Sequence, residues 1–179
     1  MRSMIMILFL LILSVAPVWS ADQPEVKVRL TVHRIVKNAQ GMETIASGES
    51  AKPGEIIEYR ATYKNIGTAT ARNVIATLPV PAEMEYVPDS AFPATANATT
   101  DGSTYSRMPL KRKVRLSTGA VAIREVPVDE YRSLRWELKE LASGASVSVS
   151  ARMKIKVNQK GPVIIKLDSI NKINKGGEK

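Results

Sequence analysis

The feature that most constrains this fold is a strict alternation of apolar and polar residues along several short segments. It is clearest at residues 147–157, where every odd-numbered residue is apolar and every even-numbered residue is a serine or a cation. Shortly before this run, Leu134, Trp136 and Leu138 alternate with charged residues, and a Ser-Gly turn signal separates the two segments. Side chains of a β-strand point alternately to opposite faces. The pattern therefore predicts two strands with one buried face, and it places Trp136 in the core.

The same alternation recurs through the rest of the chain. Residues 26–32 and 57–63 each carry four apolar side chains on one face, and a third run is built around Val74, Ala76 and Leu78. Shorter strands are predicted within residues 83–92, 114–128 and 161–170. Many short strands separated by turn signals, without a convincing amphipathic helix or an internal repeat, predict one all-β domain, a sandwich or a barrel.

A polar segment, residues 65–73, joins two of these predicted strands and raises the question of a ligand-binding loop. Gly67 can adopt positive φ and Asn65 tolerates the left-handed region, as a turn between strands requires. Pro79 and Pro81 cannot donate to a ladder, so the second strand must end there or run along an edge. The segment is therefore interpreted as turn and edge chemistry.

The N-terminus has the layout of a secretory signal peptide. Arg2 supplies a positive start, residues 5–15 are almost unbroken apolar, and Ser20 ends a small-residue cleavage site. Cleavage after Ala21 is the second choice, because it would place the bulky Trp19 three residues before the cut. An uncleaved membrane anchor is the alternative, although the apolar run is shorter than the ~20 residues of a spanning helix.

Three parts follow from this reading: a signal peptide at 1–20, a β-sandwich domain at 24–170 and a polar C-terminal tail at 171–179. The chain contains no cysteine. For an exported protein this excludes disulfides, a lipid anchor on cysteine, thiolate metal sites and thiol catalysis. Packing and hydrogen bonds must therefore hold the domain together.

Residues 53–91 carry a family resemblance. They contain a Pro-Gly turn, a Tyr-containing strand ending in Asn-x-Gly, and a strand closing on Leu-Pro. The later residues 99–106 and 131–155 add an Asp-Gly turn and a Leu-Arg-Trp strand, with a Gly turn into a final alternating strand. Together, over 26–170, the chain resembles the bacterial conserved-repeat domain, domain of unknown function eleven.

This resemblance implies an immunoglobulin-like antiparallel β-sandwich on an exported or cell-surface bacterial protein, without enzymatic activity. Many relatives carry the domain in tandem, whereas this chain holds one copy. Thr77 stands where many members have Asp, and Ser103 replaces the second Gly of a common Asp-Gly-Gly turn. Both departures argue against an inherited calcium site.

The inventory of catalytic groups is thin. His33 is the only histidine and falls on the outward face of the first strand, and there is no Gly-x-Ser-x-Gly elbow for a serine nucleophile. One histidine cannot build a zinc site, and no phosphate-binding or dinucleotide-binding glycine motif occurs. Paired carboxylates stay open as an alternative, drawn from Glu83, Glu85, Asp89, Asp101, Asp129 and Glu130. We expect no enzyme, no cofactor and no metal site.

The charge balance is strongly basic, at +9, and one segment concentrates it. Its cations are Arg107, Lys111, Arg112, Lys113 and Arg115. In an exposed hairpin or loop they would bind phosphates or other polyanions. The preferred interpretation is instead a charged edge that discourages aggregation between sheets.

The sequence thus predicts a non-enzymatic exported β-sandwich, periplasmic or at the cell surface, with a structural, adhesive or protein-binding role in the bacterial cell envelope. The alternative is a polyanion-binding envelope protein that uses the segment Lys111–Arg115, and a hydrolase is a distant third. The expected partner is an envelope protein or an anionic envelope polymer, not nucleic acid. A membrane is expected only through an uncleaved leader.

Overall fold

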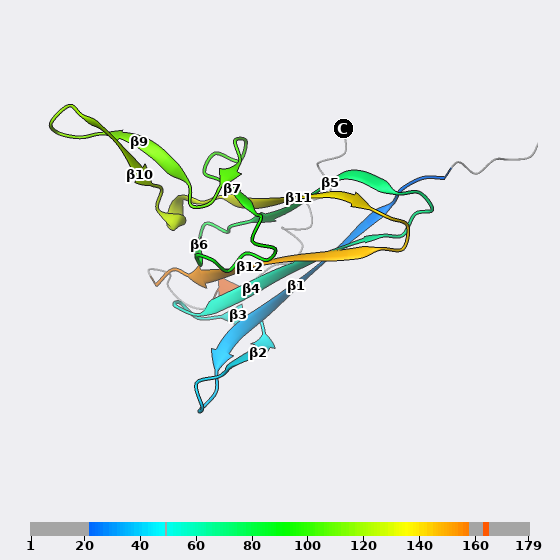
Figure 1. Ribbon diagram of the computed structural model, residues 1–179. Coiled ribbons are helices and arrows are strands. Elements are labelled where there is room, and N and C mark those ends of the chain that lie inside the picture. The colour runs from blue at the N-terminus through cyan, green and yellow to red at the C-terminus, as the bar shows by residue number, and fades with distance from the viewer. Residues whose placement is uncertain (1–21, 49, 158–162, 165–179) are drawn as a thin grey trace, which may run out of the picture.

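The computed structural model describes residues 22–48, 50–157 and 163–164, and these form an antiparallel all-β sandwich (Figure 1). The predicted fold class is confirmed. The expected signal peptide and C-terminal tail lie outside the described residues, as does most of the expected strand at 161–170. Within the described part, no helix is long and apolar enough to cross a membrane.

Two sheets make the sandwich, and two small sheets accompany them. The five-stranded sheet has the order β2-β1-β4-β12-β6, and the four-stranded sheet has the order β5-β11-β7-β8. A β9–β10 hairpin stands apart from both, and β3 pairs with β13. The strands are β1 (Val26–Lys37), β2 (Glu43–Ser47), β3 (Ser50–Ala51), β4 (Ile56–Asn65), β5 (Ala71–Pro79), β6 (Met84–Tyr86), β7 (Asn97–Thr99), β8 (Ser106–Arg107), β9 (Lys111–Arg115), β10 (Val121–Glu125), β11 (Ser133–Leu141), β12 (Ser146–Ile155) and β13 (Val163–Ile164). One 3-10 turn, η1 (Val128–Glu130), precedes β11.

The core lies between the two sheets and is built by the alternating residues. Ile57, Tyr59, Ala61 and Tyr63 of β4 are all buried, and the apolar face of β12 packs beside them. Trp136 of β11 is 1% exposed, as the alternation predicts. Strand β4 buries this face completely, whereas on β1 only Leu30 is buried and Val26, Val28 and Val32 are half-buried.

At the strand ends the alternation overstates burial. Val157 is 76% exposed because β12 ends at Ile155, so its assignment to the buried face was wrong. Leu138 and Val147 are only half-buried. The strand β2 was missed altogether, since its single large apolar side chain, Ile45, is 64% exposed and creates no inward pattern.

The connection between β4 and β5 is a bend between strands, as predicted, but for different physical reasons. Asn65 is the last residue of β4, fully buried, and it is not among the residues with positive φ. Gly67 does not have positive φ either. A Cβ at Gly67 would collide with the backbone of Gln23 and Glu25, so the glycine permits a close approach of two chain segments.

Three buried tyrosines make the stability of the fold sensitive to alkaline pH. Burial raises the pKa of Tyr59, Tyr63 and Tyr86 above the ordinary value of tyrosine. The folded state therefore keeps protons that the unfolded chain loses above about pH 10, and the free energy of unfolding falls as pH rises from there toward the folded-state pKa values.

Urea unfolding between neutral pH and pH 11 tests this expectation. The variant Tyr59→Phe removes one of the three titrating hydroxyl groups. Little else is lost, because the Tyr59 hydroxyl makes only a 3.6 Å contact with the Met84 sulfur. We expect the alkaline fall in stability to be shallower by about 1.4 kcal/mol per pH unit in this variant. An unchanged slope would contradict the assignment of the pH dependence to buried tyrosines.

Candidate functional site

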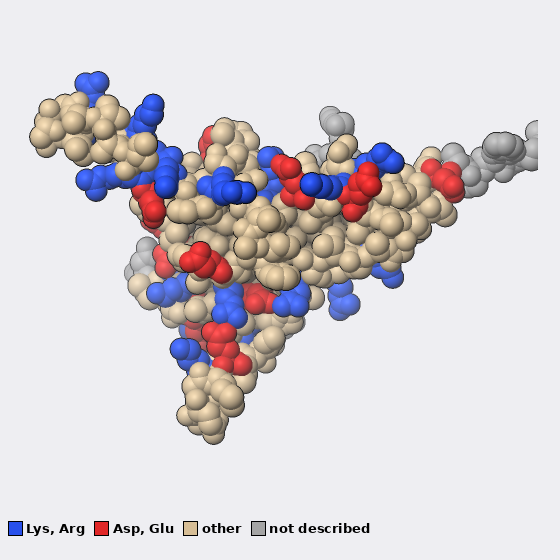
Figure 2. Space-filling model, in the orientation of Figure 1, with Lys and Arg blue, Asp and Glu red and all other residues tan. Residues whose placement is uncertain are grey.

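The basic segment found in the sequence forms one strand of a hairpin that projects from the sandwich. Strand β9 pairs with β10 and with no other described strand, and Gly119 closes the turn with positive φ. In Figure 1 this hairpin extends from the upper edge of the sandwich, and Figure 2 shows lysine and arginine side chains gathered on it. The cations Lys111, Arg112, Lys113 and Arg115 are therefore not part of an edge of either main sheet.

The base of the hairpin is fixed to the core. Leu110 and Val126 flank the two strands and are 7% and 8% exposed. The Val126 amide donates to the Leu110 carbonyl at 2.8 Å, and the Leu110 amide donates to the Tyr131 hydroxyl at 2.8 Å. Tyr131 in turn stacks on Tyr86, with ring centroids 5.9 Å apart. This anchoring gives the projecting strands a defined origin on the sandwich.

The two faces of the hairpin differ. Cross-strand register pairs Lys111 with Glu125, Lys113 with Ile123 and Arg115 with Val121. These six residues share one face, and all of them are exposed. We call this set the cationic face.

The opposite face turns toward the body of the protein. Val114 and Ala122 on it are half-buried, and Arg112 and Arg124 are cross-strand partners. The Arg112 guanidinium contacts the Glu130 carboxylate at 2.6 and 2.9 Å. Among the described residues, Arg112 is the one hairpin cation in an ion pair. Its charge is therefore partly neutralised.

The structure separates the predicted site residues into three positions. Lys111, Lys113 and Arg115 lie together on the cationic face, and Arg112 lies on the other face. Arg107 belongs to β8 of the four-stranded sheet, where it pairs with Asn97. Three of the five predicted cations thus form one surface.

Sequence reasoning missed Arg124 and the two aliphatic residues of the cationic face. Val121 is 61% exposed and Ile123 is 68% exposed, and both lie on the same face of the hairpin as the cations. The signal existed, because residues 114–128 were predicted as strand, turn and strand. Placing the turn at Thr118-Gly119 would have set Ile123 beside Lys113.

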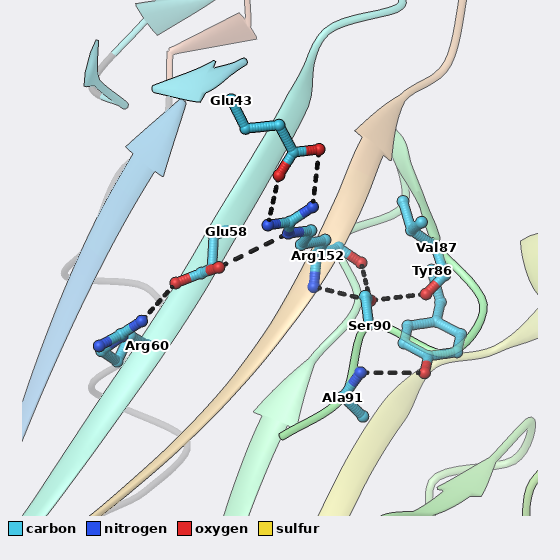
Figure 3. Close-up of polar contacts among 8 residues, drawn as sticks. All are labelled: Glu43, Glu58, Arg60, Tyr86, Val87, Ser90, Ala91 and Arg152. Carbon is cyan, nitrogen blue, oxygen red and sulfur yellow. Dashed lines mark hydrogen bonds and ion pairs between the residues drawn. The ribbon is translucent and has the colours of Figure 1, made fainter. Parts of the chain in front are cut away.

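A second concave surface lies on the outer face of the five-stranded sheet. A pocket of about 490 Å³ is walled by the segment 87–92 and floored by β4 and β12. Asp89 adopts positive φ in this wall, and Phe92 is 68% exposed at its rim. Ser90 joins wall to floor, because its hydroxyl accepts from the Arg152 amide at 3.0 Å and donates to the Val87 carbonyl at 2.6 Å (Figure 3).

The charges of this pocket neutralise one another. Arg152 contacts Glu43 at 2.9 Å and Glu58 at 3.6 Å, and Glu58 contacts Arg60 at 2.8 Å (Figure 3). The hydrogen bond that Arg152 donates to Glu43, together with the charges of the Glu43 and Glu58 carboxylates, raises the pKa of Arg152. Because two cations and two anions are linked in one network, this pocket has no excess charge to attract an anion. The cationic face does.

The potential catalytic groups are dispersed or occupied. His33 is half-buried on β1, cross-strand from Glu58. Asp101 accepts from the backbone amides of Thr104 and Ser103 and from the Thr99 hydroxyl, each at 2.8 Å, and these bonds lower its pKa. Its carboxylate therefore holds a turn. Within the described residues, no group of three or more histidine, aspartate or glutamate side chains gathers as a metal site would require.

Comparisons with known proteins add no assignment. No protein-family model, no curated protein and no solved structure matches this chain. The resemblance carried by residues 53–91, 99–106 and 131–155 therefore stays a prediction.

Proposed function

We propose that this chain is a non-enzymatic binding module of the bacterial cell envelope, exported through its leader, that contacts an anionic partner through the β9–β10 hairpin. One observation carries the proposal. The hairpin projects from the sandwich and presents Lys111, Lys113 and Arg115 on one exposed face without an ion-pair partner among the described residues. The apolar leader and the immunoglobulin-like repeat-domain resemblance support export and a non-enzymatic role.

The physical argument rests on where the charge is free to act. A salt bridge between exposed groups contributes little to stability, and unpaired exposed cations are not needed to hold this fold. They do create a positive potential that extends about a Debye length, near 8 Å at physiological salt. A hairpin that stands away from the body brings this potential to a partner without steric hindrance from the sandwich.

The sequence favoured a different interpretation, a charged edge that protects a sheet from aggregation. Because the hairpin is a separate sheet, its charge does not protect an edge of either main sheet, and only the open edges of β9 and β10 themselves are left for it to protect. The exposed Val121 and Ile123 also favour contact, since edge protection is better served by charge alone.

Binding to immobilised polyphosphate at low and high salt tests the proposal. The triple variant Lys111→Gln, Lys113→Gln, Arg115→Gln is expected to bind between about 3-fold and about 150-fold more weakly, since each exposed ionic contact contributes ~0.2–1 kcal/mol. The matched control removes three exposed cations from the far end of the sandwich, Lys27→Gln, Arg29→Gln and Lys64→Gln. It has the same net charge and should bind nearly as the wild type does.

The control decides between a site and a general charge effect. Equal losses in the two triple variants would contradict a dedicated surface and leave only the net charge. A crosslinking pull-down from intact cells addresses the remaining alternative. A defined protein partner kept at high salt and by the hairpin variant would place the binding surface elsewhere on the sandwich.

A further inference from the structure

We infer that the anionic partner of the hairpin is the surface of a lipid membrane containing anionic headgroups, with Val121 and Ile123 entering the interface. This inference rests on the proposed function and names its partner. It goes beyond the sequence prediction, in which a membrane was contacted only through an uncleaved leader.

The first step is the composition of the cationic face. The face holds three cations, two large aliphatic side chains and one anion, Glu125, which lies opposite Lys111 and leaves a net charge of about +2. Ile123 is the direct neighbour of Lys113, and Val121 is the direct neighbour of Arg115. The aliphatic side chains are 61% and 68% exposed. A soluble polyanion offers charge but little apolar surface, and it would leave these two side chains in water.

A membrane interface satisfies both kinds of side chain at once. Aliphatic groups gain by leaving water at the level of the acyl boundary, and the long stems of lysine and arginine let their charged ends stay among the headgroups. Anionic lipid also attracts basic segments within a Debye length of its surface. The charge of this face and that of an anionic leaflet are therefore complementary.

The second step is geometry. The cationic face is exposed over its whole length, whereas Val114 and Ala122 of the other face are half-buried and Arg112 is tied to Glu130. The hairpin base is fixed by Leu110 and Val126, which are buried. The hairpin projects from the sandwich (Figures 1 and 2), and we therefore expect a planar surface to meet the cationic face while the sandwich stays in water.

The other charged surface does not compete for this role. The pocket on the five-stranded sheet is concave, and its two arginines are each paired with carboxylates. A flat membrane cannot enter it. The projecting hairpin combines unpaired cations with exposed aliphatic side chains, which that pocket does not.

Vesicle flotation tests the inference, using the chain from Ala21 onward. This form contains every described strand and lacks the apolar leader, which would itself enter a bilayer. Vesicles of phosphatidylcholine alone are compared with vesicles containing an equal part of phosphatidylglycerol. We expect binding only with phosphatidylglycerol, weakened about a hundredfold by Lys111→Gln, Lys113→Gln, Arg115→Gln. The far-end control variant Lys27→Gln, Arg29→Gln, Lys64→Gln should float nearly as the wild type does.

The aliphatic residues give the decisive variant. Val121→Thr with Ile123→Thr keeps the β-propensity and the charge of the hairpin, and it is expected to weaken flotation about tenfold while binding to polyphosphate is unchanged. Unchanged flotation would overturn membrane insertion. If the wild type binds polyphosphate but does not float with vesicles, membrane insertion is overturned and the proposed function stands. If the wild type does neither, both proposals are overturned.

A fluorescent reporter measures the depth directly. Without the leader, Trp136 is the one tryptophan, and at 1% exposure it gives a constant background. In the variant Ile123→Trp, the fluorescence emission of the introduced tryptophan should shift to the blue on anionic vesicles. Arg124→Trp, on the opposite face, should not. Equal shifts at both positions, or no shift at either, would contradict the proposed orientation.

Discussion

Trp136→Ala is expected to lower the free energy of unfolding by about 3–5 kcal/mol. The side chain is 1% exposed and stands on β11, the strand that joins β5 to β7 in the four-stranded sheet. Its indole nitrogen also donates to the Pro93 carbonyl at 2.7 Å. The change would leave a large cavity between the sheets and release the segment at Pro93 from its hydrogen bond.

Urea unfolding followed by far-ultraviolet circular dichroism measures this loss, since the variant has no buried tryptophan to report by fluorescence. Trp136→Phe should lose less, because it keeps most of the apolar volume and removes only the bond to Pro93. The matched surface control is Ile75→Ala on β5, where the side chain is 52% exposed and a change within about 0.5 kcal/mol is expected. A loss below 1 kcal/mol for Trp136→Ala would contradict its role as the core anchor.

Burial was predictable for residues that belong to an alternating pattern within one strand. Trp136 and Tyr59 alternate with charged neighbours, and this alternation can be seen in the sequence of one strand without knowing which strands pair with it. Ile45 illustrates the opposite case. It sits on an edge strand whose position depends on pairing with β1, and its exposed side chain leaves no pattern in the sequence.

Only part of the candidate site could be predicted from the sequence, because only part of it lies within one strand. Lys111, Lys113 and Arg115 are spaced at period two within five residues, so their shared face follows from the strand itself. Val121 and Ile123 join that face only through the hairpin register. The outer pocket was invisible, because Arg152 meets Glu43 across more than a hundred residues of sequence.

Asn65 is the residue whose role the sequence concealed most completely. Its side chain is fully buried and bonds to four backbone groups from three chain segments. The amide donates to the carbonyls of Ala69 at 2.7 Å and Leu141 at 2.8 Å, and its oxygen accepts from the amides of Gly67 at 3.0 Å and Glu25 at 3.3 Å. The turn preference of asparagine accounts for the bond with Gly67, two residues on, but it does not predict the bonds with Glu25 and Leu141, which lie 40 and 76 residues away.

Asn65→Ala is therefore expected to cost about 3 kcal/mol of unfolding free energy, because four backbone groups lose their partner, and the bond to the Leu141 carbonyl among them is buried. Urea unfolding measures it, and the control is Thr70→Ala in the same connection, where the side chain is exposed and makes no hydrogen bond within the described part of the chain. A small loss of the same size in both variants would contradict the conclusion that the Asn65 side chain holds the three chain segments together.

Asn65→Asp separates the hydrogen bonds from the volume, since the two side chains are nearly the same size. One new carboxyl oxygen would face the carbonyls of Ala69 and Leu141, and it can donate to one of them only when it is protonated. Burial and these two carbonyls should raise the pKa of the new carboxyl above its ordinary value near 3.9. The folded state would then hold a proton that the unfolded chain releases, so stability relative to the wild type should fall as pH rises from about 4 to 7. Urea unfolding of both proteins at the two pH values measures this difference. A deficit that is equal at both, or larger at the acid pH, would show that the amide protons of Asn65 are not what holds the three segments together.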